Sequence, residues 1–261
     1  MKKTLLWILA ITITLGLSVY QRMTGPTNPK RLTVELNGEN YKLKFPRSGV
    51  RQDEIVTLKT IPQGTSAMLH YHRYPTADAY TDKDFIWNGT ELECALPVQP
   101  IAGKLQYYVT IEGKDYFKDE PLLIRFRNDV PALILIVHIL FMFGAMLFSI
   151  YAMIMALIND QNYFKWLCVT VVTMFVGGFI FGPLMQHYAF GPYWTGFPFG
   201  TDLTDNKTLI SFFFFLLPLF AKKWKYNRWL VVLASLVMIL VFTIPHSTNG
   251  SEYNYETEQM N

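Results

Sequence analysis

The chain has 261 residues, of which 51% are hydrophobic, 16% aromatic and 16% charged, and its formal net charge is +3. This composition is too apolar for an ordinary soluble protein, so we expect part of the chain to lie in a membrane. The lysines and arginines cluster beside the apolar segments, which argues against nucleic acid as a partner. Cys94 lies in a strand-like stretch and Cys168 in an apolar one, so we expect no disulfide.

The N-terminal apolar segment, residues 4–20, follows Lys2 and Lys3 as a signal peptide would. The end of this segment and the residues after it, GLSVYQRM (residues 16–23), contain no Ala-x-Ala-like cleavage site. We therefore predict that residues 1–21 form an uncleaved transmembrane signal-anchor, with cleavage as the alternative.

Residues 22–129 have the alternating pattern of β-strands, for example in RLTVELN, YKLKF and LQYYVTI. The sequences NGEN and EGKD separate such runs and are typical of hairpin turns. Further strands are expected at residues 55–60, 68–74, 90–95 and 122–127. Seven or eight strands in about 100 residues predict a small antiparallel β-sandwich.

One stretch of this region, ECALPVQPIAGKLQYYVTIEG, resembles the E and F strands and the corner of an immunoglobulin-like or fibronectin-like domain. The resemblance implies that Tyr107 or Tyr108 has the corner role. It implies a fold and no activity.

Four further apolar segments, residues 130–158, 166–181, 208–221 and 229–244, are long enough or apolar enough to be membrane spans. The second is expected to end at the helix-breaking sequence FGP, residues 181–183. Residues 130–246 would thus form a four-helix transmembrane domain, and the whole chain an α+β membrane protein. The polar residues 247–261 are predicted to be a disordered tail.

The orientation follows from positive charge in the short loops, because lysine and arginine near span ends are retained in the cytoplasm. With the N-terminus inside, the inner segments hold Lys165, Lys222, Lys223, Lys225 and Arg228, whereas the outer loop holds only Lys207. We predict a multi-pass protein of the bacterial cytoplasmic (inner) membrane, with a cytoplasmic N-terminus and with the β-sandwich and the C-terminus extracytoplasmic.

The Phe-rich segment 208–221 is short, because its 14 residues reach about 21 Å as a helix and the hydrocarbon layer is ~30 Å thick. We therefore expect its helix to begin near Thr204, with Thr204 or Asp202 as the N-cap and Asp205 in the first turn. This start would bring charged groups below the outer membrane surface, where they normally face protein or water.

The same depth argument predicts one polar pocket in the outer half of the bundle, made by His138, His187, Asp202, Asp205, Asn206, Lys207 and His246. The loop before the Phe-rich helix would cover it as a lid, with Tyr193, Trp194, Phe197 and Phe199. Each part has a plainer explanation. The aromatics fit an interfacial belt, the histidines fit solvated span ends, and the charged residues fit a helix cap.

Metal or haem binding is a second possibility for the histidines. His138, His187 and His246 are candidate ligands of a transition metal or haem, and His70 and His72 lie two apart on one face of a strand. The metal signal of the latter pair is weak, and two exposed or partly packed strand histidines are its plainer explanation. The chain contains no CxxCH, HExxH, GxSxG or phosphate-binding glycine loop, so no catalytic residue is predicted.

Two functions follow from this organisation. The first is a non-enzymatic binding, assembly or accessory subunit of an envelope complex, with the lipid bilayer and other envelope membrane proteins as partners. The alternative is a metal- or haem-binding membrane redox or transport protein that uses the outer-leaflet histidines. A third possibility is an outer-leaflet enzyme with Asp202 and Asp205 as a carboxylate pair, but a capping role explains both acids more simply.

Overall fold

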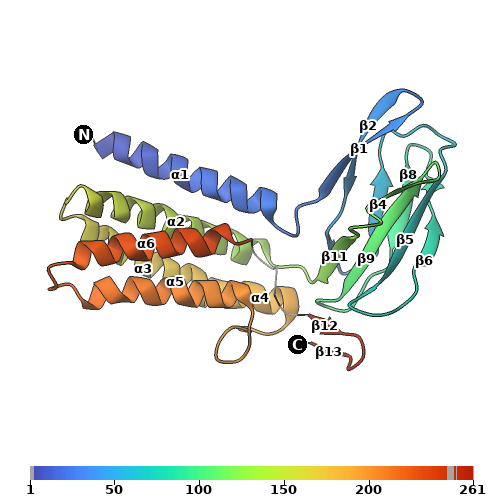
Figure 1. The fold of residues 1–261 in the computed structure, drawn as a ribbon. Coiled ribbons are helices and arrows are strands. Elements are labelled where there is room, and N and C mark those ends of the chain that lie inside the picture. Colours follow the sequence, from blue (N-terminus) through green and yellow to red (C-terminus); the bar gives the residue numbers. More distant parts are fainter. Residues whose placement is uncertain (1–2, 246–249, 251, 261) are drawn as a thin grey trace. The chain divides into compact units, whose positions relative to one another are not determined.

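The computed structural model describes residues 3–245, 250 and 252–260, and the chain divides into two compact units (Figure 1). The helical unit consists of Met1–Pro26 and Val130–Gly250, and the β unit consists of Thr27–Asp129 and Ser251–Asn261. The protein is therefore mixed α+β, with several antiparallel sheets and long apolar helices. Each unit is described by itself below.

The helical unit is built from apolar helices with short connections. Within the described residues, four helical segments are long and apolar enough to cross a membrane, and a fifth, α6, is apolar but has 17 residues. The helices are α1 (Lys3–Thr24), α2 (Ala132–Leu157), α3 (Tyr163–Phe175), the π-helix η1 (Val176–Phe181), α4 (Gly182–Phe190), α5 (Leu203–Phe220) and α6 (Asn227–Thr243).

The predicted break at FGP is wrong, because the helix continues from Tyr163 to Phe190. The chain passes Pro183 by forming η1, in which the Gly182 N–H bonds to the Gly177 carbonyl five residues earlier. A proline lacks an N–H and its ring clashes with the carbonyl four residues before it in a regular α-helix. The wider π turn avoids that clash, so the proline becomes the start of α4 rather than the end of the helix.

Helix α5 begins at Leu203, near the start that was expected from the length of the Phe-rich segment. Its N-cap is Asp202, whose carboxylate accepts hydrogen bonds from Thr204 N (2.8 Å) and Asp205 N (3.4 Å), and Asp205 lies in the first turn. The expected N-cap and first turn are thus confirmed. A carboxylate at this position satisfies N–H groups that have no partner inside the helix.

Close packing inside the helical unit depends on small and aromatic side chains. Leu6 and Ala10 of α1 are buried in the helical core, and Trp7 stacks on Tyr151 of α2 with 3.8 Å between ring centroids. Gly178 of η1 lies against α5, because a Cβ atom added there would be 2.5 Å from Cγ2 of Thr208. Small residues are the usual means by which membrane helices approach one another.

The β unit contains one six-stranded sheet and smaller sheets beside it. In the six-stranded sheet the order is β3-β11-β9-β5-β6, with β10 also paired to β9, and all pairs are antiparallel except β3 with β11. A three-stranded sheet has the order β4-β8-β7, and β1 pairs with β2. The strands are β1 (Lys30–Leu36), β2 (Glu39–Phe45), β3 (Ser48–Val50), β4 (Glu54–Leu58), β5 (Ala67–Tyr74), β6 (Thr81–Asp84), β7 (Ile86–Trp87), β8 (Leu92–Leu96), β9 (Lys104–Ile111), β10 (Lys114–Tyr116) and β11 (Leu122–Arg127).

Both predicted hairpin turns are confirmed. Asn37 and Gly38 connect β1 to β2 with φ of 53° and 81°, and Glu112 and Gly113 connect β9 to β10 with φ of 49° and 74°. Positive φ at both central residues is the type I′ geometry, whose twist matches that of the flanking strands. Strand β6, by contrast, was not predicted, because its four residues are all polar and exposed and have no alternation.

The six-stranded sheet, the three-stranded sheet and the β1-β2 sheet share one hydrophobic core. Leu105, Val56 and Val34 contribute to it from these three sheets in turn. Tyr107 lies at the centre of it with no exposed surface, and its hydroxyl donates a 2.7 Å hydrogen bond to the Pro46 carbonyl. Tyr108 instead stacks on His70, with 4.3 Å between ring centroids. Of the two tyrosines proposed for the corner, Tyr107 is the one whose hydroxyl is tied to the backbone.

Replacing Tyr107 by phenylalanine should destabilise the β unit by about 1 to 2 kcal/mol, because the Pro46 carbonyl loses its buried donor while the ring packing is kept. The free energy of unfolding can be followed by hydrogen exchange of the β9 amides in the full chain. Tyr108→Phe is the matched control and should change it by less than about 0.5 kcal/mol. Equal effects of the two substitutions would contradict the role assigned to the Tyr107 hydroxyl.

The C-terminal residues differ from the disordered tail that the sequence predicts. Residues 252–260 form a hairpin of β12 (Tyr253–Asn254) and β13 (Gln259–Met260) that belongs to the β unit. The Asn254 side chain accepts hydrogen bonds from Glu256 N (2.8 Å) and Thr257 N (3.2 Å), which closes the turn. The prediction from composition differs because Tyr255 and Glu252 attach the segment to the β unit, and a count of polar residues does not reveal these contacts. We call this segment the C-terminal hairpin.

Candidate functional site

Asp205 is the centre of the polar group predicted at the start of α5. Its carboxylate oxygen Oδ2 accepts hydrogen bonds from Thr195 N (2.7 Å) and Gly196 N (3.1 Å), and the side chain is almost fully buried. The next residue, Asn206, accepts a hydrogen bond from Phe197 N at 2.7 Å. Both side chains therefore bind the backbone of the preceding loop and hold it against α5.

Gln186 completes this arrangement. In the amide orientation that satisfies both of its polar atoms, Nε2 lies 2.9 and 3.1 Å from the two carboxylate oxygens of Asp205, and Oε1 accepts from Thr195 Oγ1 at 2.6 Å. The loop also needs a glycine, since a Cβ atom on Gly196 would be 2.6 Å from Cβ of Asp205. The groups that donate to Asp205 are the Gln186 amide of α4 and the backbone N–H groups of the loop. Asp205 therefore joins α4, the loop and α5.

The predicted lid differs from the observed loop. The loop is held to α5, but Tyr193, Phe197 and Phe199 are exposed, and of these three rings Tyr193 stacks on His187. Trp194 stacks on Phe179 with 5.7 Å between ring centroids and donates to the Phe197 carbonyl at 3.1 Å. The loop backbone, rather than its aromatic rings, contacts the acidic side chain.

Lys207 is buried but does not pair with Asp205 in any contact among the described residues. Its ammonium group donates to the Ile244 carbonyl at 2.5 Å and to the Pro245 carbonyl at 3.0 Å. These carbonyls follow the last turn of α6, where helix carbonyls have no partner inside the helix and a cation is favoured. Lys207 therefore joins the start of α5 to the end of α6.

The membrane-region histidines do not come together in the described part of the chain. His138 on α2 is within hydrogen-bond distance of the Gly177 carbonyl in η1, at 2.9 Å from Nδ1. His187 stacks on Tyr193, with 4.0 Å between ring centroids, and bonds to the Gly191 carbonyl. His246 lies outside the described residues. The described contacts of His138 and His187 are thus separate, and the single pocket predicted from depth stays a prediction.

His70 and His72 of β5 have partners within the sheet. His70 Nδ1 is 2.6 Å from Asp82 Oδ1 and its Nε2 is 2.9 Å from Thr110 Oγ1, while His72 Nε2 is 3.0 Å from Gln106 Oε1. These contacts join β5 to β6 and to β9. In residues 3–245, 250 and 252–260, no three His, Cys, Asp or Glu side chains gather as a metal site requires. The metal or haem alternative stays a prediction.

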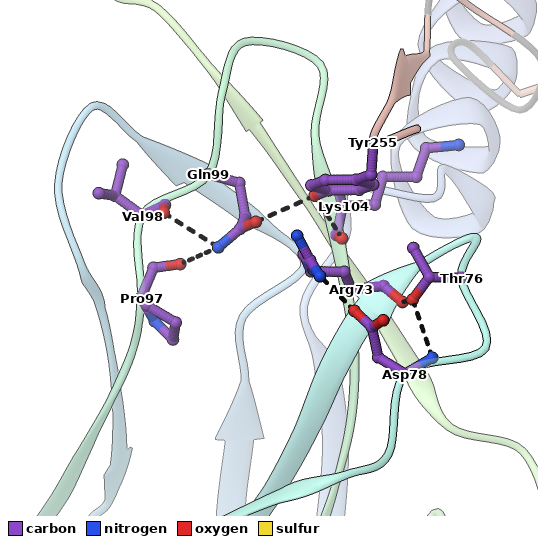
Figure 2. A network of polar contacts seen from close by, with 8 residues as sticks. All are labelled: Arg73, Thr76, Asp78, Pro97, Val98, Gln99, Lys104 and Tyr255. Carbon is purple, nitrogen blue, oxygen red and sulfur yellow. Dashed lines mark hydrogen bonds and ion pairs between the residues drawn. The ribbon is translucent and has the colours of Figure 1, made fainter. Parts of the chain in front are cut away.

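The sequence did not reveal the most connected polar site of the β unit, which is formed where the C-terminal hairpin meets the start of β9 (Figure 2). The Tyr255 hydroxyl accepts a hydrogen bond from Lys104 N at 3.0 Å, and it lies 2.9 Å from the Lys104 carbonyl and 3.1 Å from Gln99 Oε1. Glu252 forms an ion pair with Lys104 at 2.7 Å. The Arg73 guanidinium lies over the Tyr255 ring, 5.4 Å from its centroid.

A tyrosine phenol keeps its proton at neutral pH and can donate, and burial raises the pKa of Tyr255 further, to about 12. With one proton and two lone pairs, it satisfies both the N–H and the C=O of one residue, Lys104. No local sequence signal marks this contact, because the hydroxyl and its partner are separated by 151 positions.

No protein-family model, characterised protein or solved structure matches this chain significantly. The function must therefore be inferred from the contacts of the chain itself. The polar contacts of the helical unit join the loop before α5 to α5, and the start of α5 to the end of α6. The polar contacts of the β unit hold the C-terminal hairpin, which comes from a distant part of the sequence.

Proposed function

We propose that the protein is a multi-pass protein of the bacterial cytoplasmic membrane whose outward-facing β unit is a non-enzymatic binding module, serving as an accessory or assembly subunit of an envelope complex. The long apolar helices and the many exposed leucine, isoleucine, valine and phenylalanine side chains on them favour a lipid environment. The shared core of the β sheets is compatible with the immunoglobulin-like sandwich that the sequence suggests.

A topological argument supports one part of the proposed arrangement, namely that the β unit and the C-terminal hairpin lie on the same side of the membrane. The C-terminal hairpin and residues 27–129 belong to the same compact unit, so both must lie on the same side of the membrane. The chain between them must then cross an even number of times. Crossings by α2, by the continuous helix Tyr163–Phe190, by α5 and by the shorter α6 give that even number. A crossing by α1 puts the N-terminus on the side opposite the β unit, and the positive charge of the short loops assigns that side to the cytoplasm.

The observation that carries the binding function is that the β unit already holds a segment of polypeptide on its surface. The hairpin contacts it through a tyrosine hydroxyl, an ion pair and a guanidinium stacked on the ring. The buried charged groups of the helical unit, by contrast, are used to hold backbone in place, as Asp205 and Lys207 do. This contrast favours recognition by the β unit over chemistry in the bundle.

The orientation can be tested by labelling single cysteines in intact cells with a membrane-impermeant maleimide. Cysteines placed at the exposed positions Asp119 and Glu258 should react, whereas one at Lys223 should react only after lysis. Cys168 is replaced by serine, and Cys94 serves as an internal blank, because burial raises its pKa to about 11 and keeps it as an unreactive thiol. Protection of the first two cysteines would overturn the proposed topology.

The binding function can be tested with a photo-crosslinking amino acid at Val98, an exposed residue beside Gln99. We expect one discrete adduct with an envelope membrane protein, saturable by that protein when it is co-expressed. Ile86, which is also exposed but lies on β7, is the control position and should give no such adduct. Absence of a discrete adduct at Val98, with the β unit shown to be folded, would contradict the proposal.

A further inference from the structure

The C-terminal hairpin lies on the β unit without being part of its hydrophobic core. That core and the side chains packed against it come from residues 32–126 and include no residue of the hairpin. Glu256, Thr257, Glu258 and Gln259 are exposed, and the attachment depends on Tyr255 and Glu252. The β unit should therefore keep its core when the hairpin is displaced.

The receiving surface is held in place by contacts that do not involve the hairpin. Arg73 Nε donates to Asp78 Oδ2 at 2.7 Å, and this bond keeps the pKa of Asp78 below its usual range. The Gln99 amide donates to the carbonyls of Pro97 (3.1 Å) and Val98 (3.0 Å), which turns its oxygen toward Tyr255 (Figure 2). A site whose side chains are already positioned loses less entropy when a ligand binds.

The fit around the tyrosine is close. A Cβ atom on Gly103 would lie 2.9 Å from the Tyr255 hydroxyl oxygen and 2.8 Å from the Pro100 carbonyl oxygen. The backbone N–H of Tyr253 also points to the Ala102 carbonyl, at 3.4 Å. The surface thus recognises backbone, a phenol and, through Lys104, a carboxylate three residues before the phenol.

We infer that the surface formed by Arg73, Gln99, Gly103 and Lys104 is a recognition site for an acidic, tyrosine-containing protein segment, and that the C-terminal hairpin is a built-in occupant which a partner segment of the same chemistry displaces. This inference rests on the proposed binding function and specifies its ligand. We call this surface the tyrosine site.

The test uses the detergent-purified chain ending at Gly250 and a fluorescent peptide with the sequence of residues 250–260. The peptide should bind this shortened chain saturably and should bind the full chain at least tenfold more weakly, because the covalently linked hairpin has an effective concentration in the millimolar range. A peptide with Tyr255→Ala should lose at least tenfold in affinity, whereas one with Glu258→Gln, a change at an exposed position, should bind as the parent does.

Two substitutions in the shortened chain locate the binding. Arg73→Ala and Gly103→Ala should each weaken the peptide by about fivefold or more, whereas Lys114→Ala, on the exposed β10, should have no effect. Failure of the shortened chain to bind, with the β9 amides still protected from hydrogen exchange, would overturn the inference. So would equal binding to the shortened and the full chain.

This outcome is distinguishable from failure of the proposed function. If a partner crosslinks at Val98 but the free peptide does not compete with it, the binding function stands and the tyrosine site is rejected as its locus. If the peptide binds the shortened chain but no partner crosslinks at Val98, the tyrosine site is a binding site for the chain's own C-terminal hairpin, and the proposed function is rejected.

Discussion

Replacing Asp205 by alanine is expected to destabilise the helical unit by about 2 to 4 kcal/mol. The substitution leaves the N–H groups of Thr195 and Gly196 without their acceptor in a buried position, and it removes the partner of the Gln186 amide. The loss of a hydrogen-bonded carboxylate costs the desolvation of each group left unpaired. Thermal unfolding in detergent measures the effect, and faster proteolysis of residues 191–202 should accompany it.

Asp205→Asn is the informative companion. Both backbone donors use the same carboxylate oxygen, so an asparagine Oδ1 can accept from both, while the Gln186 amide turns over to present its oxygen to the new NH₂ group. The asparagine variant should therefore lose less than half as much stability as the alanine variant. If the two variants are equally unstable, the charge of Asp205 matters more than its acceptor geometry, and the role assigned here is wrong.

Gly178→Ala should destabilise the packing of η1 against α5 by about 1 to 3 kcal/mol, even though alanine is the better helix former. The new methyl group would meet Cγ2 of Thr208 at 2.5 Å, a distance that forces the helices apart or Thr208 out of its rotamer. The measurement is the thermal unfolding of the purified protein in detergent.

The chain offers both a control and a rescue for this prediction. At Gly144 an added Cβ meets only Phe148 Cε2 at 3.6 Å, an ordinary contact, so Gly144→Ala should be neutral or slightly stabilising. Thr208→Ser removes the clashing methyl group and keeps the hydroxyl that donates to the Thr204 carbonyl. The double variant Gly178→Ala with Thr208→Ser should recover most of the lost stability, and no recovery would show that the clash is not the cause.

Elements with a strong local pattern could be predicted from the sequence. The apolar helices, the alternating strands and the hairpins at Asn37-Gly38 and Glu112-Gly113 all have their cause within a few residues. A length argument that compares a helix with a bilayer narrowed the N-cap of α5 to Thr204 or Asp202, and the structure has Asp202. In each case the residues that determine the structure are neighbours in the chain.

The predictions failed where distant residues or backbone adjustments decide the structure. The helix continues through Pro183 by forming a π turn, and no residue type in the sequence predicts such a turn. The partners of single side chains were also beyond a depth argument, because depth does not specify the azimuth at which a side chain leaves its helix. His138 is within hydrogen-bond distance of the Gly177 carbonyl, and Lys207 donates to the Ile244 carbonyl. The order of the C-terminal hairpin depends on a surface formed by Gln99 and Lys104, far away in sequence.

The contact between Tyr255 and Lys104 also imposes an order of events on biogenesis. During synthesis β9 emerges 151 residues before this tyrosine, and every helix from α2 to α6 is made in the interval. The contacts of the Lys104 N–H and C=O with the Tyr255 hydroxyl can therefore form only after the helical unit has been translated. Attachment of the C-terminal hairpin to the β unit is therefore a late step of folding, which requires that α6, the last helix, has already been translated.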